Sequence, residues 1–111
     1  MAFDEKLADR VRDALPPHDS ITERKMFGGI AFMIAGNMCC GVLGDDLIVR
    51  LGNEEGERAL AEPHTRPFDF TGRPMKSTLY VSGERLREDP DLSAWVGRAV
   101  DFCLSLPPKG G

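Results

Sequence analysis

Cysteine and histidine are the residue types in this 111-residue chain that could support nucleophilic, redox or metal chemistry. Cys39 and Cys40 are adjacent, and neighbouring residues of a strand point to opposite faces, so the two thiols are poorly placed to bind one metal ion together. His18 and His64 lie in separate proline-containing segments without a ligand pattern. We therefore predict no catalytic residue, no metal and no cofactor. Thiol redox chemistry at an accessible Cys40, and a cysteine–histidine pair formed only in the fold, are the alternatives.

Gly28 and Gly29 follow a segment of strand composition, as the glycines of a phosphate-binding loop do. They lack the spacing of the dinucleotide and Walker motifs. A second strand-like segment follows them, where a phosphate site needs the N-terminus of a helix. A turn or a bulge is therefore the better interpretation of this glycine pair.

The charge balance is acidic, with 14 Lys and Arg against 18 Asp and Glu and a net charge of −4. This balance excludes nucleic-acid binding by bulk electrostatics, so we do not expect direct DNA binding. Residues 64–87 are locally basic, with five Lys and Arg against two Asp and Glu. A small-molecule binding protein or an enzyme that holds an anionic ligand near Arg50, Arg73 or Lys76 is therefore the alternative to a role in protein contacts.

Two long helices are predicted at the ends of the chain. Before Pro16–Pro17, which stop a helix, apolar side chains recur every four residues, at Phe3, Leu7, Val11 and Leu15. The second long helix begins at Asp89–Pro90 and ends before Pro107–Pro108, because its apolar residues keep helical spacing over this length.

Residues 22–51 contain short strand-like segments that alternate with glycine-containing turns. This pattern predicts a four-stranded antiparallel meander. A two-residue turn at Gly36–Asn37 would pair Ile34 with Cys39 and give the second and third strands a common core face.

The loop after the third strand decides which side chains of the fourth strand face the core. A three-residue loop over residues 44–46 pairs Leu43 with Leu47, whereas a two-residue turn at 45–46 would bring the charge of Arg50 to the core face. We prefer the three-residue loop. The predicted core face is Ile30, Phe32, Ile34, Cys39, Leu43, Leu47, Val49 and Leu51.

The opposite face of the predicted meander is nearly as apolar as the core face. It consists of Ala31, Met33, Ala35, Met38, Cys40, Val42, Ile48 and Arg50. An antiparallel sheet that faces water on one side normally carries polar residues there. We therefore expect a homodimer formed through this face, chiefly through Ala31, Met33, Met38, Cys40, Val42 and Ile48. The alternative is that another helix of the same chain covers it.

The remaining segments complete a single predicted domain over residues 1–111, of which 109–111 form a frayed tail. A short helix is expected from Asn53 through Leu60 or Ala61, a loop or irregular edge over 62–76, and a strand over 77–82. The fold class is α+β, a two-layer sandwich with a mainly antiparallel five-stranded sheet and helices on one face, in the order α-β-β-β-β-α-β-α. No apolar run approaches membrane-spanning length and the N-terminus is not of signal-peptide type, so we expect a cytoplasmic protein.

Two segments of the sequence resemble the N-terminal domain of TfoX/Sxy-type proteins. They are Arg24-Lys25-Met26-Phe27-Gly28-Gly29 and Asp69-Phe70-Thr71-Gly72-Arg73-Pro74-Met75-Lys76. The residues that match the family's motifs are Met26, Phe27, Gly28, Gly29, Arg50, Gly72, Arg73 and Lys76. The resemblance implies an α+β fold like that of secretion chaperones, which is often dimeric, and it carries over no catalytic residue.

The same resemblance implies a regulatory role. The founding members regulate competence genes together with the cyclic-AMP receptor protein, and they carry a second, helical domain to which no part of this chain corresponds. We therefore expect a non-enzymatic interaction domain that acts as a co-regulator of transcription or competence through protein contacts. Its partner would be a transcription regulator or a polymerase-associated protein.

Overall fold

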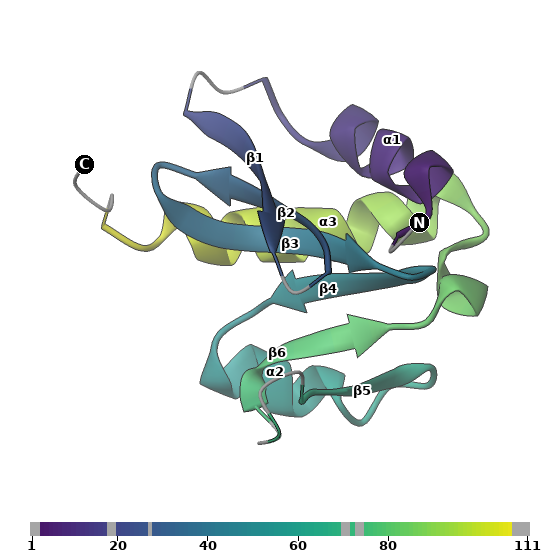
Figure 1. The fold of residues 1–111 in the computed structure, drawn as a ribbon. Helices are drawn as coiled ribbons and strands as arrows, with labels where there is room; N and C mark the ends of the chain where they lie inside the picture. The colour runs from purple at the N-terminus through teal and green to yellow at the C-terminus, as the bar shows by residue number, and fades with distance from the viewer. Residues whose placement is uncertain (1–2, 18–19, 27, 70–71, 73–74, 108–111) are drawn as a thin grey trace.

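The computed structural model describes residues 3–17, 20–26, 28–69, 72 and 75–107. Its helices and strands follow the chain in the order α1 (Glu5–Ala14), β1 (Ile21–Met26), β2 (Gly29–Ile34), β3 (Asn37–Leu43), β4 (Asp46–Arg50), α2 (Asn53–Ala59), β5 (Thr65–Phe68), β6 (Met75–Val81), the 3-10 helix η1 (Gly83–Leu86) and α3 (Asp89–Leu104). The strands form one antiparallel sheet in the order β1-β2-β3-β4-β6-β5 (Figure 1). This confirms the α+β class, with one strand more than expected, because β5 forms an edge strand within the predicted loop.

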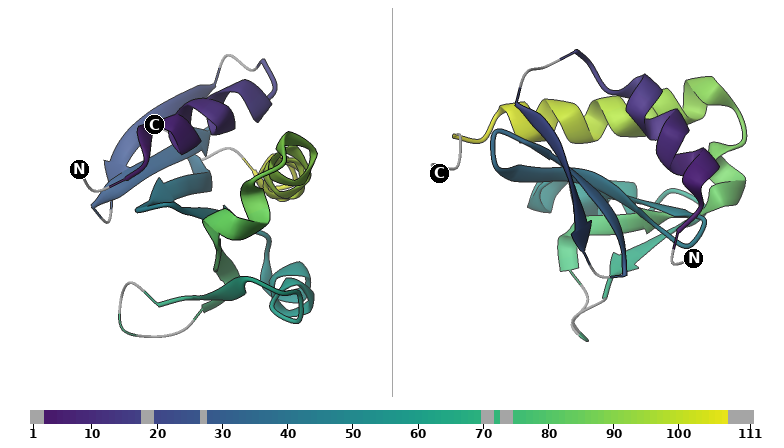
Figure 2. Two further views of the ribbon diagram at one scale, coloured as in Figure 1. Left: turned by 90° about the vertical axis from the view of Figure 1, so that its right-hand side faces the viewer. Right: turned by 45° about the horizontal axis from the view of Figure 1, so that its top comes forward.

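The helices pack along one side of the sheet, which we call the inner face (Figure 2). Helices α1 and α3 contact each other, α3 lies on β3 and β4, and α2 packs beside β6. The carboxylate of Asp4 begins α1 by accepting hydrogen bonds from the backbone N–H groups of Lys6 and Leu7, at 2.9 and 3.3 Å. No helix in the described part of the chain is long and apolar enough to span a membrane.

The main hydrophobic core lies between the inner face and the three helices. Phe32, Leu47 and Val49 of the sheet and Val96 of α3 are fully buried there, and Trp95 is nearly so. The predicted inward orientation of Ile30, Phe32, Ile34, Leu47, Val49 and Leu51 is confirmed.

The turn between β2 and β3 lies one residue earlier than predicted. Ala35 and Gly36 form it, both with left-handed backbone (φ 51° and 83°), and Ile34 pairs with Asn37. A register shift beside Phe32 then places Phe32 opposite Cys40. This bulge adds one unpaired residue to β3. The residues of β3 that follow it therefore point to the face opposite the one predicted for them. Cys40 and Val42 therefore lie in the main core with Cys39, and not on the opposite face.

The turn between β3 and β4 also differs from the prediction. It is a two-residue turn over residues 44–45, since Leu43 pairs with Asp46 and Val42 with Leu47. Leu43 therefore belongs to the opposite face, where it packs against Ile48 and its neighbours. The shorter turn between β3 and β4 offsets the bulge in β3. The side chains of β4 therefore point to the predicted faces although both turns differ from the prediction.

We call the face opposite the helices the outer face. Ala31, Met33 and Ile48 lie on it as predicted, but their exposed fractions are 0%, 9% and 0%. Ile48 forms a small second core with Phe68 of β5 and Tyr80 of β6, against which Met38 and Leu43 are partly buried. The chain itself thus buries much of the outer face, so the expectation of an open apolar surface there was wrong. The homodimer stays a prediction that needs another surface.

Candidate functional site

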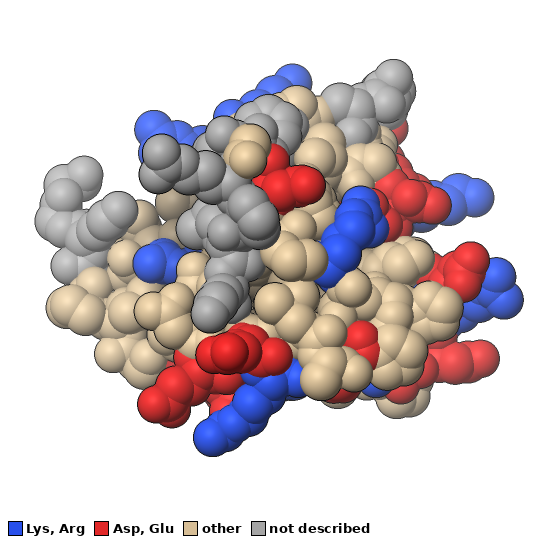
Figure 3. Space-filling view, turned by 90° about the horizontal axis from the view of Figure 1, so that it is seen from below, with Lys and Arg blue, Asp and Glu red and all other residues tan. Residues whose placement is uncertain are grey.

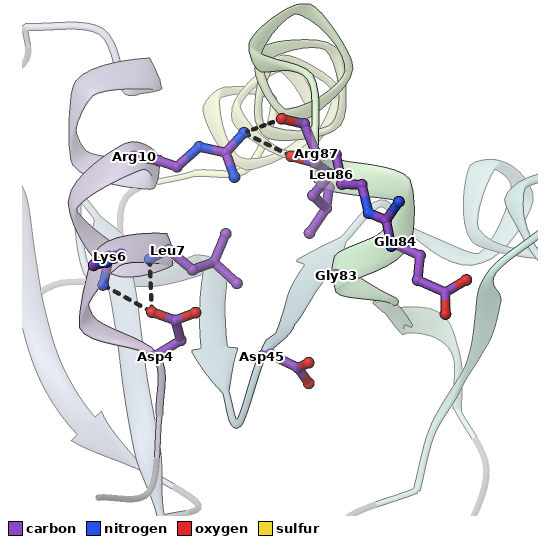
Figure 4. A pocket seen from close by; sticks show the side chains of 9 residues that line it. All are labelled: Asp4, Lys6, Leu7, Arg10, Asp45, Gly83, Glu84, Leu86 and Arg87. Atoms are coloured by element: carbon purple, nitrogen blue, oxygen red, sulfur yellow. Dashed lines mark hydrogen bonds between the residues drawn. The ribbon is translucent and has the colours of Figure 1, made fainter.

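A pocket of about 590 Å³ lies between the start of α1, the β3–β4 turn and η1 (Figure 4). We call it the charged depression. Its lining residues are Asp4, Lys6, Leu7, Arg10, Asp45, Gly83, Glu84, Leu86 and Arg87.

Close backbone contacts hold the three walls of the charged depression together. The N–H of Asp4 donates a hydrogen bond to the carbonyl oxygen of Gly44 at 2.7 Å, so the start of α1 is fixed to the β3–β4 turn. On the other side, a Cβ at Gly83 would lie 2.7 Å from the carbonyl oxygen of Asp45. A residue with a side chain at position 83 would therefore push η1 away from this turn.

Arg10 connects α1 to η1 and α3 across the upper margin of the charged depression (Figure 4). Its guanidinium donates hydrogen bonds to the carbonyl oxygen of Leu86 at 2.6 Å and to the carboxylate of Asp89 at 3.0 Å. Because these donors are already engaged, Arg10 serves to position the walls rather than to bind a ligand.

The other charged side chains of the depression are of mixed sign. Lys6 and Arg87 are basic, Asp45 and Glu84 are acidic, and none of the four is paired with another of them in the described contacts. Glu84 lies 3.5 Å from Nδ1 of His64. A site with basic and acidic side chains suits a partner protein whose polar surface also carries both signs of charge. It suits a phosphate-containing ligand less well, because the two carboxylates would repel the phosphate.

A second group of charges ties α2 and the segment after it to α3. Both carboxylate oxygens of Glu62 are used, one by Arg85 at 3.2 Å and the other by Arg98 at 2.9 Å. The same two guanidinium groups lie 5.6 and 4.4 Å from the ring centre of Trp95. Trp95 is only 3% exposed, so this cluster stabilises the fold and offers little surface for binding.

The motif residues that the structure describes do not all lie in one site. Gly28 and Gly29 connect β1 to β2, while Arg50 ends β4 at the opposite end of the sheet. Arg50 extends to α3, where its guanidinium lies 5.7 Å from the ring centre of Phe102. Met26 is exposed at the end of β1.

The other matching positions are only partly described. Gly72 has a left-handed backbone with φ 87°, and Lys76 lies within β6. Phe27 and Arg73 lie outside the described residues, as does the side chain of Lys76. The alternative of an anionic ligand near Arg50, Arg73 and Lys76 therefore stays a prediction.

The two glycines of the first motif have separate structural roles. Gly28 adopts a left-handed backbone with φ 79°, which favours glycine. At Gly29, a Cβ would lie 2.1 Å from the carbonyl oxygen of Val42, so only glycine allows β2 to approach β3 this closely. Gly28 thus lies in a turn, as predicted for this pair, whereas Gly29 is the first residue of β2 and pairs with Met26.

All three cysteines are buried, and none is placed for thiol chemistry at the surface. The hydrogen bond with Cys40 and burial raise the pKa of Cys39, and burial raises the pKa of Cys103 to about 11. The prediction that Cys40 is accessible was wrong, because the bulge in β3 turns it into the main core. No group of three or more His, Cys, Asp or Glu side chains among the described residues is arranged to hold a metal ion.

Comparison with known protein families assigns the chain to one of them. The family model described as TfoX N-terminal domain matches residues 13–103, which is most of the chain. The chain belongs to this family. Comparison with curated proteins and with solved structures finds no match. The resemblance carried by the two motif segments is thereby confirmed, and the family is linked to the regulation of competence.

The matched span of the TfoX N-terminal domain contains part of the charged depression. Asp45 and the η1 residues lie within it, whereas Asp4, Lys6, Leu7 and Arg10 precede it. Sequence reasoning missed the charged depression because its walls come from three distant segments with no motif of their own. The signal that was available is the helix-start pattern at Asp4 and the glycine at Gly83, neither of which indicates a binding site by itself.

Proposed function

We propose that this TfoX N-terminal domain is a non-enzymatic regulatory module of the cytoplasm, which acts by binding a partner protein at the charged depression. The observation that supports this function is the mixed charge of that site, which is lined by Lys6, Arg87, Asp45 and Glu84 together with the buried side chains of Leu7 and Leu86. Protein–protein interfaces combine such polar rims of both signs with apolar centres.

The distribution of charge among the described residues on one face of the molecule favours a protein partner over DNA. DNA binding depends on several basic side chains that together neutralise phosphates. On the face seen in Figure 3, acidic and basic side chains are interspersed, and the described residues form no continuous basic surface there. A partner with complementary charges of both signs, such as a transcription regulator or a polymerase-associated protein, fits this surface better.

The test uses the intact chain and two purified candidate partners, RNA polymerase holoenzyme and the cyclic-AMP receptor protein. Binding to each is measured by biolayer interferometry, with a DNA duplex of unrelated sequence at low salt as the third analyte. We expect binding to at least one protein. The double variant Lys6→Glu/Arg87→Glu should weaken it about tenfold or more, since two rim charges are reversed.

Arg58→Glu is the control for the reversal of a single charge elsewhere on the surface, because Arg58 is an exposed residue of α2 away from the charged depression. It should bind like the unaltered chain. Two results would contradict the proposal. One is that the depression variant and the control bind equally well. The other is that the chain binds DNA with an affinity that falls steeply as salt is raised.

A further inference from the structure

Strand β1 is an edge of the sheet whose free side can be assigned residue by residue. The N–H of Ala35 donates a hydrogen bond to the carbonyl oxygen of Ser20 at 3.1 Å. In an antiparallel pair, hydrogen-bonded and non-hydrogen-bonded positions alternate. The backbone groups of Thr22, Arg24 and Met26 therefore point to β2, and those of Ile21, Glu23 and Lys25 point away from the sheet.

This free edge is long, regular and exposed. Five of the six residues of β1 are exposed, and its pairing with β2 has no register shift or proline. Met26, at the end of β1, is one of two large hydrophobic side chains that the described structure leaves exposed. An unpaired edge with these properties can accept a further strand by backbone hydrogen bonding.

The charges of β1 favour one register of pairing with a second copy of the same strand. In a symmetric antiparallel pair, residues whose backbone groups point away from the sheet must lie opposite residues of the same kind in the second copy. Glu23 can therefore lie opposite either Glu23 or Lys25 of the second copy. With Glu23 opposite Lys25 of the second copy, the two-fold axis passes between the two Arg24 residues. This register creates two Glu–Lys pairs, both on the inner face because Glu23 lies opposite Phe32. The carboxylate of Glu23 already accepts hydrogen bonds from Arg12 of its own copy at 2.7 and 2.8 Å, so Lys25 of the second copy would join an existing ion pair.

The neighbouring registers give no such pairs. With the axis at Glu23, two carboxylates lie directly opposite each other, and with the axis at Lys25 two ammonium groups do. In the favoured register the two Arg24 side chains meet on the outer face, and on the inner face Lys25 of the second copy approaches Arg12, which is bound to Glu23. The same register places Thr22 opposite Met26 of the second copy, which covers part of an exposed apolar side chain.

We infer that two copies of this chain pair antiparallel through β1, with Arg24 opposite its own counterpart, and so continue the two six-stranded sheets into one. Glu23 and Lys25 of the two copies exchange four backbone hydrogen bonds in this arrangement. The occupant of the β1 edge is thus a second copy, and the proposed partner site at the charged depression is separate from it.

Cysteine cross-linking tests the register. In a non-hydrogen-bonded antiparallel pair the Cα atoms are about 4.5 Å apart, within the range of about 4.4 to 6.8 Å that a disulfide spans. Arg24→Cys should therefore form a covalent dimer when oxidised glutathione removes two electrons and two protons from the thiol pair. The native thiols are buried and provide a low background.

Two further variants control for unspecific oxidation. Thr22→Cys alone and Met26→Cys alone should not cross-link, because neither residue faces its own counterpart. A mixture of the two variants should cross-link, because Thr22 faces Met26 of the second copy. Equal cross-linking of all the single variants would contradict the register.

Sedimentation velocity over a range of concentrations tests the pairing itself without added thiols. Lys25→Glu should weaken the dimer about tenfold, because it replaces both Glu–Lys pairs by Glu–Glu pairs. Glu23→Lys should weaken the dimer through Lys–Lys pairs and also by removing the bond between Arg12 and Glu23 within each copy, so Lys25→Glu is the cleaner of the two variants. Mixing these two variants should restore a dimer, since every pair is then of opposite charge.

Thermal melts of each variant show whether the fold is retained, and this keeps the mixing result interpretable. A chain that sediments as a 12.2 kDa monomer at every concentration, together with no cross-link for Arg24→Cys, would overturn the inference. That outcome would mean that the charges of β1 protect the edge against pairing. It would leave the binding test at the charged depression unaffected.

Discussion

The two edges of the sheet, β1 and β5, are built in opposite ways (Figure 1). Strand β5 has four residues, a register shift and a proline. The N–H of Ser82 donates to the carbonyl oxygen of His64, so these two residues form a hydrogen-bonded pair. Because hydrogen-bonded and non-hydrogen-bonded positions alternate along the strand, the backbone groups of Thr65 and Pro67 point away from β6. Pro67 has no N–H there, and the hydroxyl of Thr65 donates back to the backbone at Ala59 and Glu62. The edge at β5 is thus closed, whereas the edge at β1 keeps every outward N–H.

The two edges also differ in how they are attached to the molecule. Phe68 of β5 is 8% exposed, and its ring centre lies 5.2 Å from that of Tyr80. Strand β1 is held by backbone pairing and by the guanidinium of Arg12, which donates to the carboxylate of Glu23 at 2.7 and 2.8 Å. Burial of Phe68 anchors the closed edge, whereas polar contacts and the partly buried side chain of Ile21 at the start of β1 hold the open one.

The largest expected effect is on the closed edge. Phe68→Ala should lower the free energy of unfolding by about 3 kcal/mol, because it removes a buried ring and leaves a cavity beside Tyr80 and Ile48. Met26→Ala on β1 should cost less than about 0.5 kcal/mol, because that side chain is 36% exposed and packs loosely. Urea denaturation at one low protein concentration measures both. Similar losses for the two variants would remove the distinction between the edges.

The second prediction tests the assigned direction of each β1 backbone group. Arg24→Pro should cost about 2 to 3 kcal/mol, since it deletes an N–H that bonds to β2 and leaves the carbonyl of Ala31 unpaired. Lys25→Pro should cost less than about 1 kcal/mol, because its N–H points away from the sheet. The same urea experiment compares these adjacent positions.

Lys25→Pro should also make β1 resemble β5 by removing an outward donor. The double variant Arg24→Cys/Lys25→Pro should therefore form less of the disulfide dimer than Arg24→Cys alone, while its free energy of unfolding stays close to that of Arg24→Cys. If Lys25→Pro is the more destabilising of the two proline variants, the assignment of backbone directions along β1, which starts from the hydrogen bond between Ala35 and Ser20, is wrong.

Much of the fold was predictable because apolar side chains keep helical spacing in α1 and α3, and because glycine-containing turns separate the continuous apolar segments of β2 and β4. The turn at 35–36 was not, because Ala35 adopts a left-handed backbone that sequence patterns assign to glycine or asparagine. Asn37, expected in that turn, instead donates its side-chain N–H to the carbonyl oxygen of Pro107 at 3.0 Å. This contact joins residues 70 positions apart, so no local pattern reveals it.

The candidate site was less predictable than the fold. Arg10, which positions the walls of the charged depression, bonds to Asp89 across 79 positions of the chain. The segments that stood out in the sequence, at Gly28–Gly29 and at Arg50, lie at opposite ends of the sheet. Motif residues therefore identified the family, but the charged depression depends on contacts that only the folded chain brings together.

The smallest expected effect concerns the ion pair that anchors the open edge. The hydrogen bond from Arg12 lowers the pKa of Glu23 below its usual 4.5. A lowered pKa means that the pair stabilises the fold above the unfolded-state pKa and that this contribution is lost as the pH falls through the folded-state pKa. Glu23→Gln should therefore cost less than about 1 kcal/mol near neutral pH, because both side chains are about 40% exposed.

The stability difference between the native chain and Glu23→Gln should shrink as the pH falls below 4.5 and should also shrink at high salt. Glu54→Gln, at an exposed carboxylate of α2 without an ion pair among the described contacts, is the control and should show a smaller change. A difference that does not vary with pH would mean that backbone pairing alone holds β1. The open edge would then depend on β2 for its position, and its charges would act only between copies of the chain.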